Sequence, residues 1–142
     1  MAVLMELSRI LIRELNDYQI IELREARESG SSEQPPPRAF PIVIGLPEAH
    51  AIERSLKGIT VKRPQTHDLL ASVIHELGGS LRSITVNALT DATFFATLDV
   101  LHGGKLLHID ARPSDALALA VGAGVPVYVE ESVLEAASKD EP

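Results

Sequence analysis

The sequence contains no cysteine and no tryptophan, and aromatic residues make up only 4% of it. Without cysteine, disulfide bonds, thiolate zinc sites and a cysteine nucleophile are excluded. The same absence suits a reducing compartment, so we expect a cytoplasmic protein. Few aromatic side chains leave few platforms on which nucleic-acid bases could stack.

Long apolar runs and a positive net charge are also missing. No run approaches the ~18 residues of a membrane span, and the opening MAVLMELSRI does not resemble a signal peptide, so we expect no membrane partner. The 13 basic and 20 acidic residues give a net charge of −7, which disfavours binding of nucleic acid on a broad basic face. A site that contacts a phosphate briefly, or with the help of a metal ion, is compatible with this charge.

The sequence does contain alternating apolar patterns typical of strands, interrupted by helical segments. Its 142 residues, 45% of them hydrophobic, are enough for one domain with an ordinary core. Because the strands come in runs, with helices between the runs, we predict an α+β fold: a single domain with a mixed, largely antiparallel β-sheet and three to four helices. The strands are expected at residues 3–13, 18–25, 40–44, 81–88, 93–101, 105–110 and 125–129, and the helices begin near Pro47, Thr66, Ser114 and Val133.

Four local expectations accompany this fold. The domain covers residues 1–138, residues 139–142 form a disordered tail, and the Ser- and Pro-rich segment 28–38 is an exposed connector. In the first helix Ala49, Ile52 and Leu56 define the buried face, which leaves Glu48 on the wet face. Thr66 and Ser114 cap the second and third helices. The second helix is expected to bury five apolar side chains, namely Leu69, Leu70, Val73, Ile74 and Leu77.

Two helix entrances share one design. Residues 63–70 read RPQTHDLL and residues 112–117 read RPSDAL, so each places an arginine and a proline before a hydroxyl residue and an acid in the first helical turn. The similarity suggests two corners of the fold that could face one another. No Gly-rich phosphate loop, GxSxG elbow or HExxH zinc motif is present to suggest another chemistry.

The second corner gathers groups suited to phosphoryl chemistry. Asp110, Arg112, Ser114 and Asp115 lie within six residues: carboxylates can hold Mg²⁺ or Mn²⁺, an arginine can steady developing charge, and a helix N-terminus offers free amides to a phosphate. The first corner, residues 63–68, would add a candidate base. Both corners can also be read structurally, as caps and ion pairs that stabilise helix ends. The isolated histidines are interpreted as solvated or satisfied by neighbours, namely His50, His102 and His108.

At these same residues the chain resembles the bifunctional nuclease domain, a family found in bacteria and plants. The matching stretches include residues 38–45 (RAFPIVIG), 63–69 (RPQTHDL), 109–120 (IDARPSDALALA) and 125–129 (VPVYV). Gln65 departs from the leucine that we expect in the family. The resemblance implies an α+β domain with a mixed sheet, a tendency to form homodimers or larger homo-oligomers, and cleavage of DNA or RNA.

Two hypotheses follow for the function. The first is a nuclease that hydrolyses phosphodiester bonds, with His67, Asp68, Asp110, Arg112 and Asp115 as catalytic residues. In this hypothesis Mg²⁺ or Mn²⁺ would be held by Asp68, Asp110 and Asp115, and the substrate would be bound by Arg38, Arg63, Thr66 and Ser114. The second is a non-catalytic oligomeric module that binds a small anionic ligand or a protein partner at the two corners.

Overall fold

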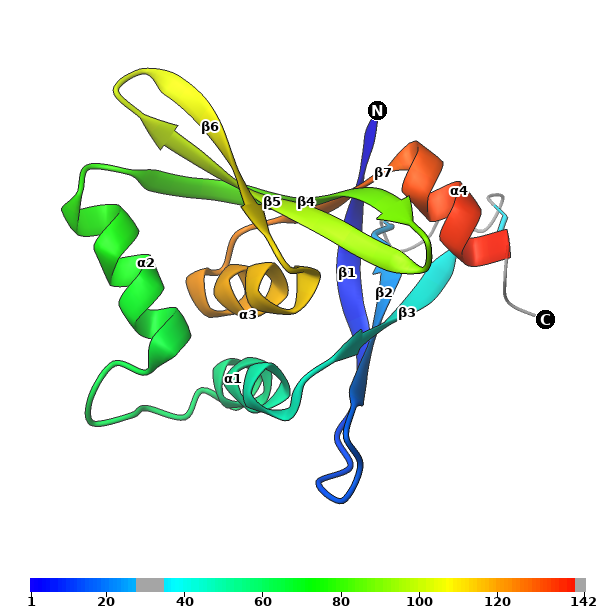
Figure 1. Cartoon of the computed structure of the whole chain (residues 1–142), viewed down its shortest axis with the longest axis horizontal. Coiled ribbons are helices and arrows are strands. Elements are labelled where there is room, and N and C mark those ends of the chain that lie inside the picture. Colours follow the sequence, from blue (N-terminus) through cyan, green and yellow to red (C-terminus); the bar gives the residue numbers. More distant parts are fainter. Residues whose placement is uncertain (28–34, 140–142) are drawn as a thin grey trace.

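One continuous sheet organises the chain in the computed structural model (Figure 1), which describes residues 1–27 and 35–139. Within these ranges it has seven strands in the order β3-β2-β1-β7-β4-β5-β6. Every neighbouring pair is antiparallel except β4 and β7, which are parallel. The strands are β1 (Ala2–Leu11), β2 (Gln19–Glu25), β3 (Ala39–Ile44), β4 (Ser80–Thr90), β5 (Thr93–His102), β6 (Lys105–Ala111) and β7 (Val127–Glu130).

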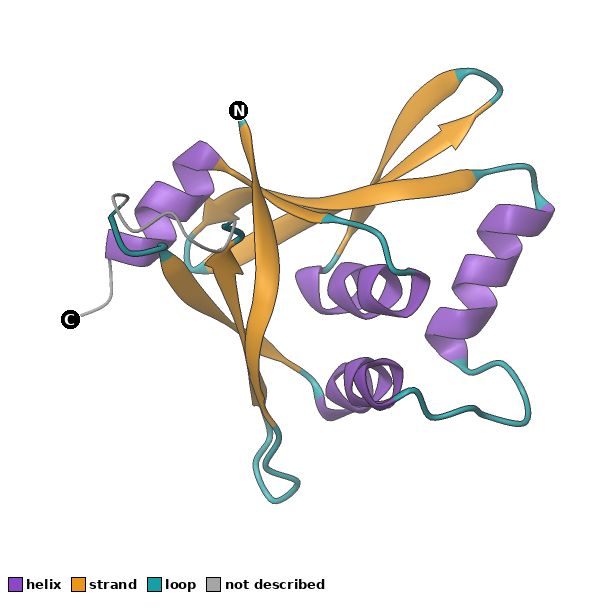
Figure 2. Ribbon diagram, turned by 180° about the vertical axis from the view of Figure 1, so that it is seen from behind, coloured by secondary structure: helices purple, strands orange, loops and turns teal. Residues whose placement is uncertain are grey.

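Four helices of the described chain pack around this sheet. They are α1 (Leu46–Lys57), α2 (Thr66–Glu76), α3 (Pro113–Ala123) and α4 (Glu131–Lys139). Helices α1, α2 and α3 lie together, whereas α4 lies at the other end of the molecule from α2 (Figures 1 and 2). The mixed sheet and the helix count confirm the predicted single α+β domain.

The strands follow from alternating sequence and tight turns. In β3 every second side chain is buried, namely Phe40, Ile42 and Ile44, because successive residues of a strand point to opposite faces. The predicted turn at Gly103-Gly104 joins β5 and β6 with φ values of 58° and 76°, a left-handed conformation that a two-residue hairpin turn requires and glycine supplies without strain.

The sheet curls so that its two halves enclose the core. Strands β1 to β3 cross β4 and β5 at a steep angle in both ribbon views (Figures 1 and 2). Phe40 of β3 and Phe94 of β5 stack with their ring centroids 5.4 Å apart, although the two strands lie far from each other in the sheet. Helix α3 is apolar nearly all round because it is covered by α1 on one side and by the curled sheet on the other.

The prediction that α2 buries its apolar residues is wrong. No residue of α2 is buried, and Leu69 and Leu77 are 55% and 73% exposed. Helix α2 lies at the edge of the molecule and contacts α3 and β4 along one line, where Ala71 and Ile74 pack partly against the core. An apolar face is therefore left uncovered by the described chain.

Two expectations for α1 are also wrong. Leu56 is 54% exposed, and in the same turn it is Ser55 that approaches α3, at Gly122. Glu48, expected on the wet face, is buried. Helix α1 does begin at its Pro47 turn and does end at Gly58, whose φ of 66° suits a left-handed helix end.

The expected tail and connector largely lie outside the described residues. The structure does not describe residues 28–34 of the connector or residues 140–142 of the tail. Lys139, the first residue of the expected tail, is the last residue of α4. Within the described ranges, no helix has both the length and the apolar character needed to cross a membrane.

Candidate functional site

His67 and Asp115 bring the two similar helix entrances together. His67 lies in the first turn of α2 and Asp115 in the first turn of α3, and His67 Nε2 is 3.0 Å from Asp115 Oδ1. The other oxygen of the same carboxylate, Oδ2, accepts a hydrogen bond from Arg112 Nε at 2.9 Å and forms an ion pair with Arg112 Nη2 at 2.8 Å. The expectation that the two corners face one another is confirmed.

Glu48, in the first turn of α1, forms an ion pair with Arg112 and so adds a third helix to the group formed by His67, Asp115 and Arg112. Its Oε1 lies 3.2 Å from Arg112 Nη2, so the start of α1 joins the starts of α2 and α3. Gly45 makes room for the buried carboxylate, since a Cβ there would lie only 3.1 Å from Glu48 Oε1. We call His67, Asp115, Arg112 and Glu48 the three-helix cluster.

Hydrogen bonding keeps the Asp115 carboxylate ionised. Burial alone would raise its pKa, but the hydrogen bonds from His67 and Arg112, together with the Arg112 charge, hold the pKa below the ordinary aspartate range. An ionised carboxylate can only accept a hydrogen bond, so His67 donates its Nε2 proton to Asp115. In the neutral imidazole Nδ1 then carries the lone pair, and it makes no hydrogen bond within the described chain.

A cavity of 330 Å³ adjoins His67 on the side of α1. It is lined by Leu46, Pro47, His50, Ala51, Arg54, Gln65, Thr66 and His67, a set that contains no carboxylate. Arg54 forms no ion pair within the described residues, whereas His50 lies 3.4 Å from Glu14. The free guanidinium of Arg54 makes this a locally positive pocket in an acidic protein, although the N-terminus of α2 is already capped by Asp68.

Sequence reasoning missed Arg54 and the role of Glu48. Arg54 stands two turns into α1, far from either corner in the sequence, so no local motif marks it. Glu48 is an acid in the first turn of a helix, a placement that ordinarily stabilises the helix dipole and needs no partner. Only the packing of α1 against α3 reveals that both side chains face the cluster.

The carboxylate of Asp68 belongs to a helix cap. The backbone N–H of Gln65 donates to Asp68 Oδ2 at 3.0 Å, and Gln65 and Asp68 together form a capping box at the start of α2. The N-cap is therefore Gln65, not the predicted Thr66. The N-cap of α3 is likewise Arg112 rather than Ser114, since proline favours the first helical position and places the residue before it in the cap.

The three carboxylates proposed as metal ligands do not converge. Asp68 serves the α2 cap, Asp110 is exposed on the edge strand β6, and Asp115 is engaged by His67 and Arg112. Among residues 1–27 and 35–139, no group of three or more His, Cys, Asp or Glu side chains is arranged to hold a metal ion. The residues present do not fit the expected Mg²⁺ or Mn²⁺ site.

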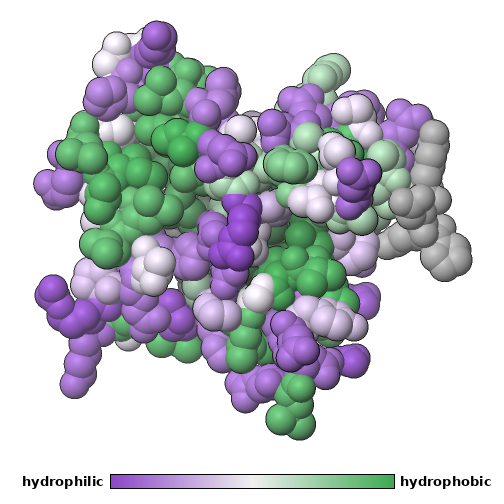
Figure 3. All heavy atoms as spheres, in the orientation of Figure 1, coloured by the Kyte–Doolittle hydropathy of each residue, from purple (hydrophilic) through white to green (hydrophobic). Residues whose placement is uncertain are grey.

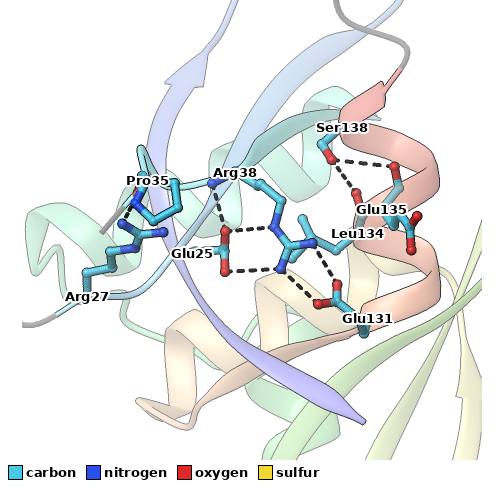
Figure 4. Close-up of polar contacts among 8 residues, drawn as sticks. All are labelled: Glu25, Arg27, Pro35, Arg38, Glu131, Leu134, Glu135 and Ser138. Carbon is cyan, nitrogen blue, oxygen red and sulfur yellow. Dashed lines mark hydrogen bonds and ion pairs between the residues drawn. The ribbon is translucent and has the colours of Figure 1, made fainter. Parts of the chain in front are cut away.

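Arg38 lies in a separate ion-pair network beside α4 (Figure 4). Its Nε donates to Glu25 Oε1 at 2.9 Å and its Nη1 to Glu131 Oε2 at 2.7 Å. The hydrogen bonds from Arg38 lower the pKa of both carboxyl groups. The guanidinium thus connects β2 to α4 and is already occupied by two carboxylates.

Arg63, another predicted substrate ligand, is exposed and forms no hydrogen bond or ion pair within the described chain.

A second His–Asp pair lies on the sheet. Asp99 is 4% exposed and accepts hydrogen bonds from Ser83, Thr85 and Thr97 as well as from His108 Nδ1 at 2.8 Å. These partners share one sheet face because the register pairs Ser83 and His108 with Asp99. His108 is thus satisfied by a neighbour, as expected of an isolated histidine.

Comparison with known proteins supports the resemblance seen in the sequence. Residues 31–142 match the family model of the bifunctional nuclease domain. The chain is 38% identical over 125 residues to an uncharacterized protein of Mycobacterium tuberculosis strain H37Rv, an alignment that covers 88% of this chain and 70% of the relative. An uncharacterized protein of the CDC 1551 strain matches to the same extent.

Proposed function

Because the chain belongs to the bifunctional nuclease domain family, we propose that it hydrolyses phosphodiester bonds of DNA or RNA at the three-helix cluster. The observation that carries the proposal is the His67–Asp115 hydrogen bond of 3.0 Å beside a positive pocket. A histidine oriented by a carboxylate and adjacent to a phosphate site is the arrangement that proton transfer to and from a phosphodiester needs.

His67 acts as the general base in this proposal. Its Nδ1 accepts a proton from a water molecule, whose oxygen forms a bond to phosphorus while the ester P–O bond breaks. The departing oxygen takes a proton from solvent. Asp115 holds the imidazole in the tautomer that leaves Nδ1 free and stabilises the imidazolium once it forms.

Basic groups around His67 hold the phosphate. Arg54 has no ion-pair partner in the described chain, and Thr66 lines the same cavity at the start of α2. Arg112 stands on the other side of Asp115 with most of its side chain exposed. Because this positive region is small within a chain of net charge −7, we expect weak binding of nucleic acid, with a shallow salt dependence because few phosphates are neutralised.

The test is cleavage of labelled single-stranded DNA and RNA by the purified chain with Mg²⁺, with Mn²⁺ and with EDTA. We expect His67→Ala and Asp115→Asn each to lower the cleavage rate by about 10²–10⁴-fold, the usual contribution of a positioned acid–base group. Matched controls are His75→Ala, at the exposed end of the same helix, and Asp91→Asn in the β4–β5 turn. Both should cleave like the parent chain.

An Asp110→Asn arm separates this route from metal-assisted cleavage. Cleavage that EDTA abolishes and Asp110→Asn removes, but His67→Ala leaves intact, would overturn the proposal and place the chemistry at the edge strand β6. No cleavage under any condition would favour the second candidate, a non-catalytic module. That candidate is supported by the fact that the Asp115 carboxylate is already fully engaged by His67 and Arg112.

We further propose that the chain forms homo-oligomers in the cytoplasm, with a second copy covering the apolar face of α2 and β6. Apolar residues gather over α2 and the β5–β6 hairpin (Figure 3), and the exposed ones include Leu69, Leu70, Val73, Leu77, Leu107 and Ile109. Strand β6 is also an unpaired edge of the sheet. Two identical edges can pair in antiparallel fashion about a two-fold axis, so a second copy suits both features.

A further inference from the structure

A large cavity of the described chain lies beside the three-helix cluster, at the start of α3. Its volume is 470 Å³, within the range of about 300–1,000 Å³ typical of small-molecule sites. The β1–β2 turn, strand β3, the β4–β5 turn and the first residues of α3 line it. Segments far apart in the sequence thus converge on one hollow.

Ser114 points a free polar group into this cavity. The residue is 7% exposed and lines the cavity, yet its hydroxyl forms no hydrogen bond within the described chain. The hydroxyl oxygen is also not fully buried. Among the described residues every fully buried side-chain oxygen or nitrogen has a hydrogen-bond partner, and this oxygen has none. A largely buried hydroxyl that faces open space without a partner is available to a ligand.

The surroundings of Ser114 favour an anion. It is the second residue of α3, an 11-residue helix, so its backbone N–H is among those without a partner inside the helix. Arg112 lines the same cavity, and its Nη1 makes no contact within the described chain. The nearby Asp115 carboxylate is not part of the lining, and its charge is offset by Arg112.

The opposite part of the cavity is apolar and partly aromatic. Tyr18, Pro41, Val43 and Phe94 belong to its lining, and the first three are exposed at the surface. Exposed aromatic and aliphatic side chains next to an anion site suit a ligand with a flat ring system and a phosphate. Asp17, also in the lining, can accept hydrogen bonds from the hydroxyl or amino groups of such a ligand.

We propose that this cavity binds a phosphate monoester that carries a flat ring system, such as a nucleoside 5′-monophosphate, with the phosphate at Ser114 and Arg112 and the base against Tyr18 and Phe94. Binding requires no bond cleavage, so it can be tested separately from the chemistry proposed for His67, although Arg112 contributes to both sites. The same group occurs in a free nucleotide and at the 5′ end of a nucleic-acid strand.

The test is calorimetric titration of the whole chain with five probes. These are adenosine 5′-monophosphate, adenosine, inorganic phosphate, a 5′-phosphorylated trinucleotide and the same trinucleotide without the phosphate. We expect the monophosphate to bind about tenfold or more tightly than adenosine or phosphate alone, because a hydrogen bond to a charged group contributes about 1.5–3 kcal/mol. Binding of the free nucleotide alone indicates a small-molecule site, whereas phosphate-dependent binding of the trinucleotide indicates recognition of strand ends.

Substitutions at Ser114 locate the site. Ser114→Asp keeps a residue that helix starts favour but repels a phosphate, so it should abolish monophosphate binding. Because Ser114 is only 7% exposed, the Tm is measured to establish that the variant is folded at the temperature of the titration. Ser132→Asp makes the same change at the second position of α4 and should bind like the parent chain. Tyr18→Ala should weaken binding of adenosine and the monophosphate but leave inorganic phosphate unaffected.

Two results would overturn the inference: no titration with the monophosphate, or monophosphate binding that Ser114→Asp leaves intact in a folded protein. Either result can occur together with normal nuclease cleavage, which would leave the function proposed for His67 standing. Conversely, a chain that binds the monophosphate but cleaves nothing would retain this site and lose the nuclease proposal.

Discussion

Three carboxylates of this protein each accept several side-chain or backbone hydrogen bonds. Asp115, Asp99 and Glu25 each accept hydrogen bonds from at least two donors, and the pKa of each carboxyl lies below its ordinary range. A carboxyl whose pKa is lower in the folded than in the unfolded chain stabilises the fold above the unfolded value. That contribution is lost as the pH falls through the folded pKa, so the described chain is expected to lose stability below about pH 4.

Asp99→Asn tests this pH dependence at the most buried of the three. Burial would raise the pKa of Asp99, but the hydrogen bonds from His108, Thr85, Ser83 and Thr97 lower it. The asparagine side chain has no charge, and its NH₂ group, a donor, faces groups that are themselves donors. We therefore expect the free energy of unfolding to fall by about 1–3 kcal/mol at pH 7. Urea unfolding at pH 7 and pH 3 should show a smaller difference between the two pH values than in the parent chain. An unchanged pH dependence would mean that Asp99 is not among the groups that titrate with unfolding.

Arg38 provides a second prediction for a single residue. Arg38→Met removes the charge that links Glu25 to Glu131 and leaves the two carboxylates facing each other. Because the side chain of Arg38 is about one-third exposed, we expect a modest loss, about 1 kcal/mol. Cleavage should be unchanged, since this network lies beside α4. Arg24→Met, which disrupts only an exposed pair with Glu6, serves as the control. Reduced cleavage by a folded Arg38→Met protein would contradict this expectation and support the role in substrate binding that the sequence predicted for Arg38.

Elements were predictable to the extent that local patterns determine them. Apolar runs and alternating apolar residues marked the strands, and Pro47 and Gly58 marked the ends of α1. The sequence of α2 is typical of a buried helix, but its burial depends on what packs against it, and its main contacts in the described chain are with α3 and β4. The cap of α2 was misplaced by one residue because Gln65 is a less common N-cap than the threonine that follows it.

The cap of α2 yields a prediction for this element. Asp68→Ala removes one half of the capping box, and the helix has no buried side chain to compensate. We expect a loss of about 0.5–2 kcal/mol, concentrated in α2. Hydrogen exchange should show faster exchange of the α2 amides than of the α3 amides. Asp68→Asn should be milder, because its side-chain oxygen can still accept from the Gln65 N–H. Equal exchange in parent chain and Asp68→Ala would show that the cap does not stabilise the helix.

At the scale of the whole molecule, the site depends on long-range packing. The similarity of the two corners suggested that they meet, and the His67–Asp115 contact confirms it. The Arg112–Glu48 pair joins residues 64 positions apart, and no local pattern could indicate it. The second His–Asp pair likewise depends on the register of three neighbouring strands. Charge and hydropathy predicted a single α+β domain. The geometry of the site could not be predicted from them, because it depends on how distant segments pack in the fold.

The uncovered face of α2 and β6 leads to a prediction for assembly. We expect the parent chain to sediment as a dimer or larger species, and the double variant Leu70→Lys/Val73→Lys to sediment as a monomer. Two charges placed among partly exposed apolar residues oppose burial against a second copy. Leu15→Lys, in the fully exposed β1–β2 turn, is the matched control and should leave the assembly unchanged. A parent chain that is monomeric at all concentrations would contradict the proposed interface.

Strand β7 determines when the protein can fold during its synthesis. It has only four residues, 127–130, yet it separates β1 from β4 and is the sole strand that pairs with both. Until these residues leave the ribosome, the sheet exists as two halves, β3-β2-β1 and β4-β5-β6, each with an open edge. The two halves can therefore close only once residues 127–130 have been synthesised, and until then chaperones that shield exposed strand edges would find a substrate.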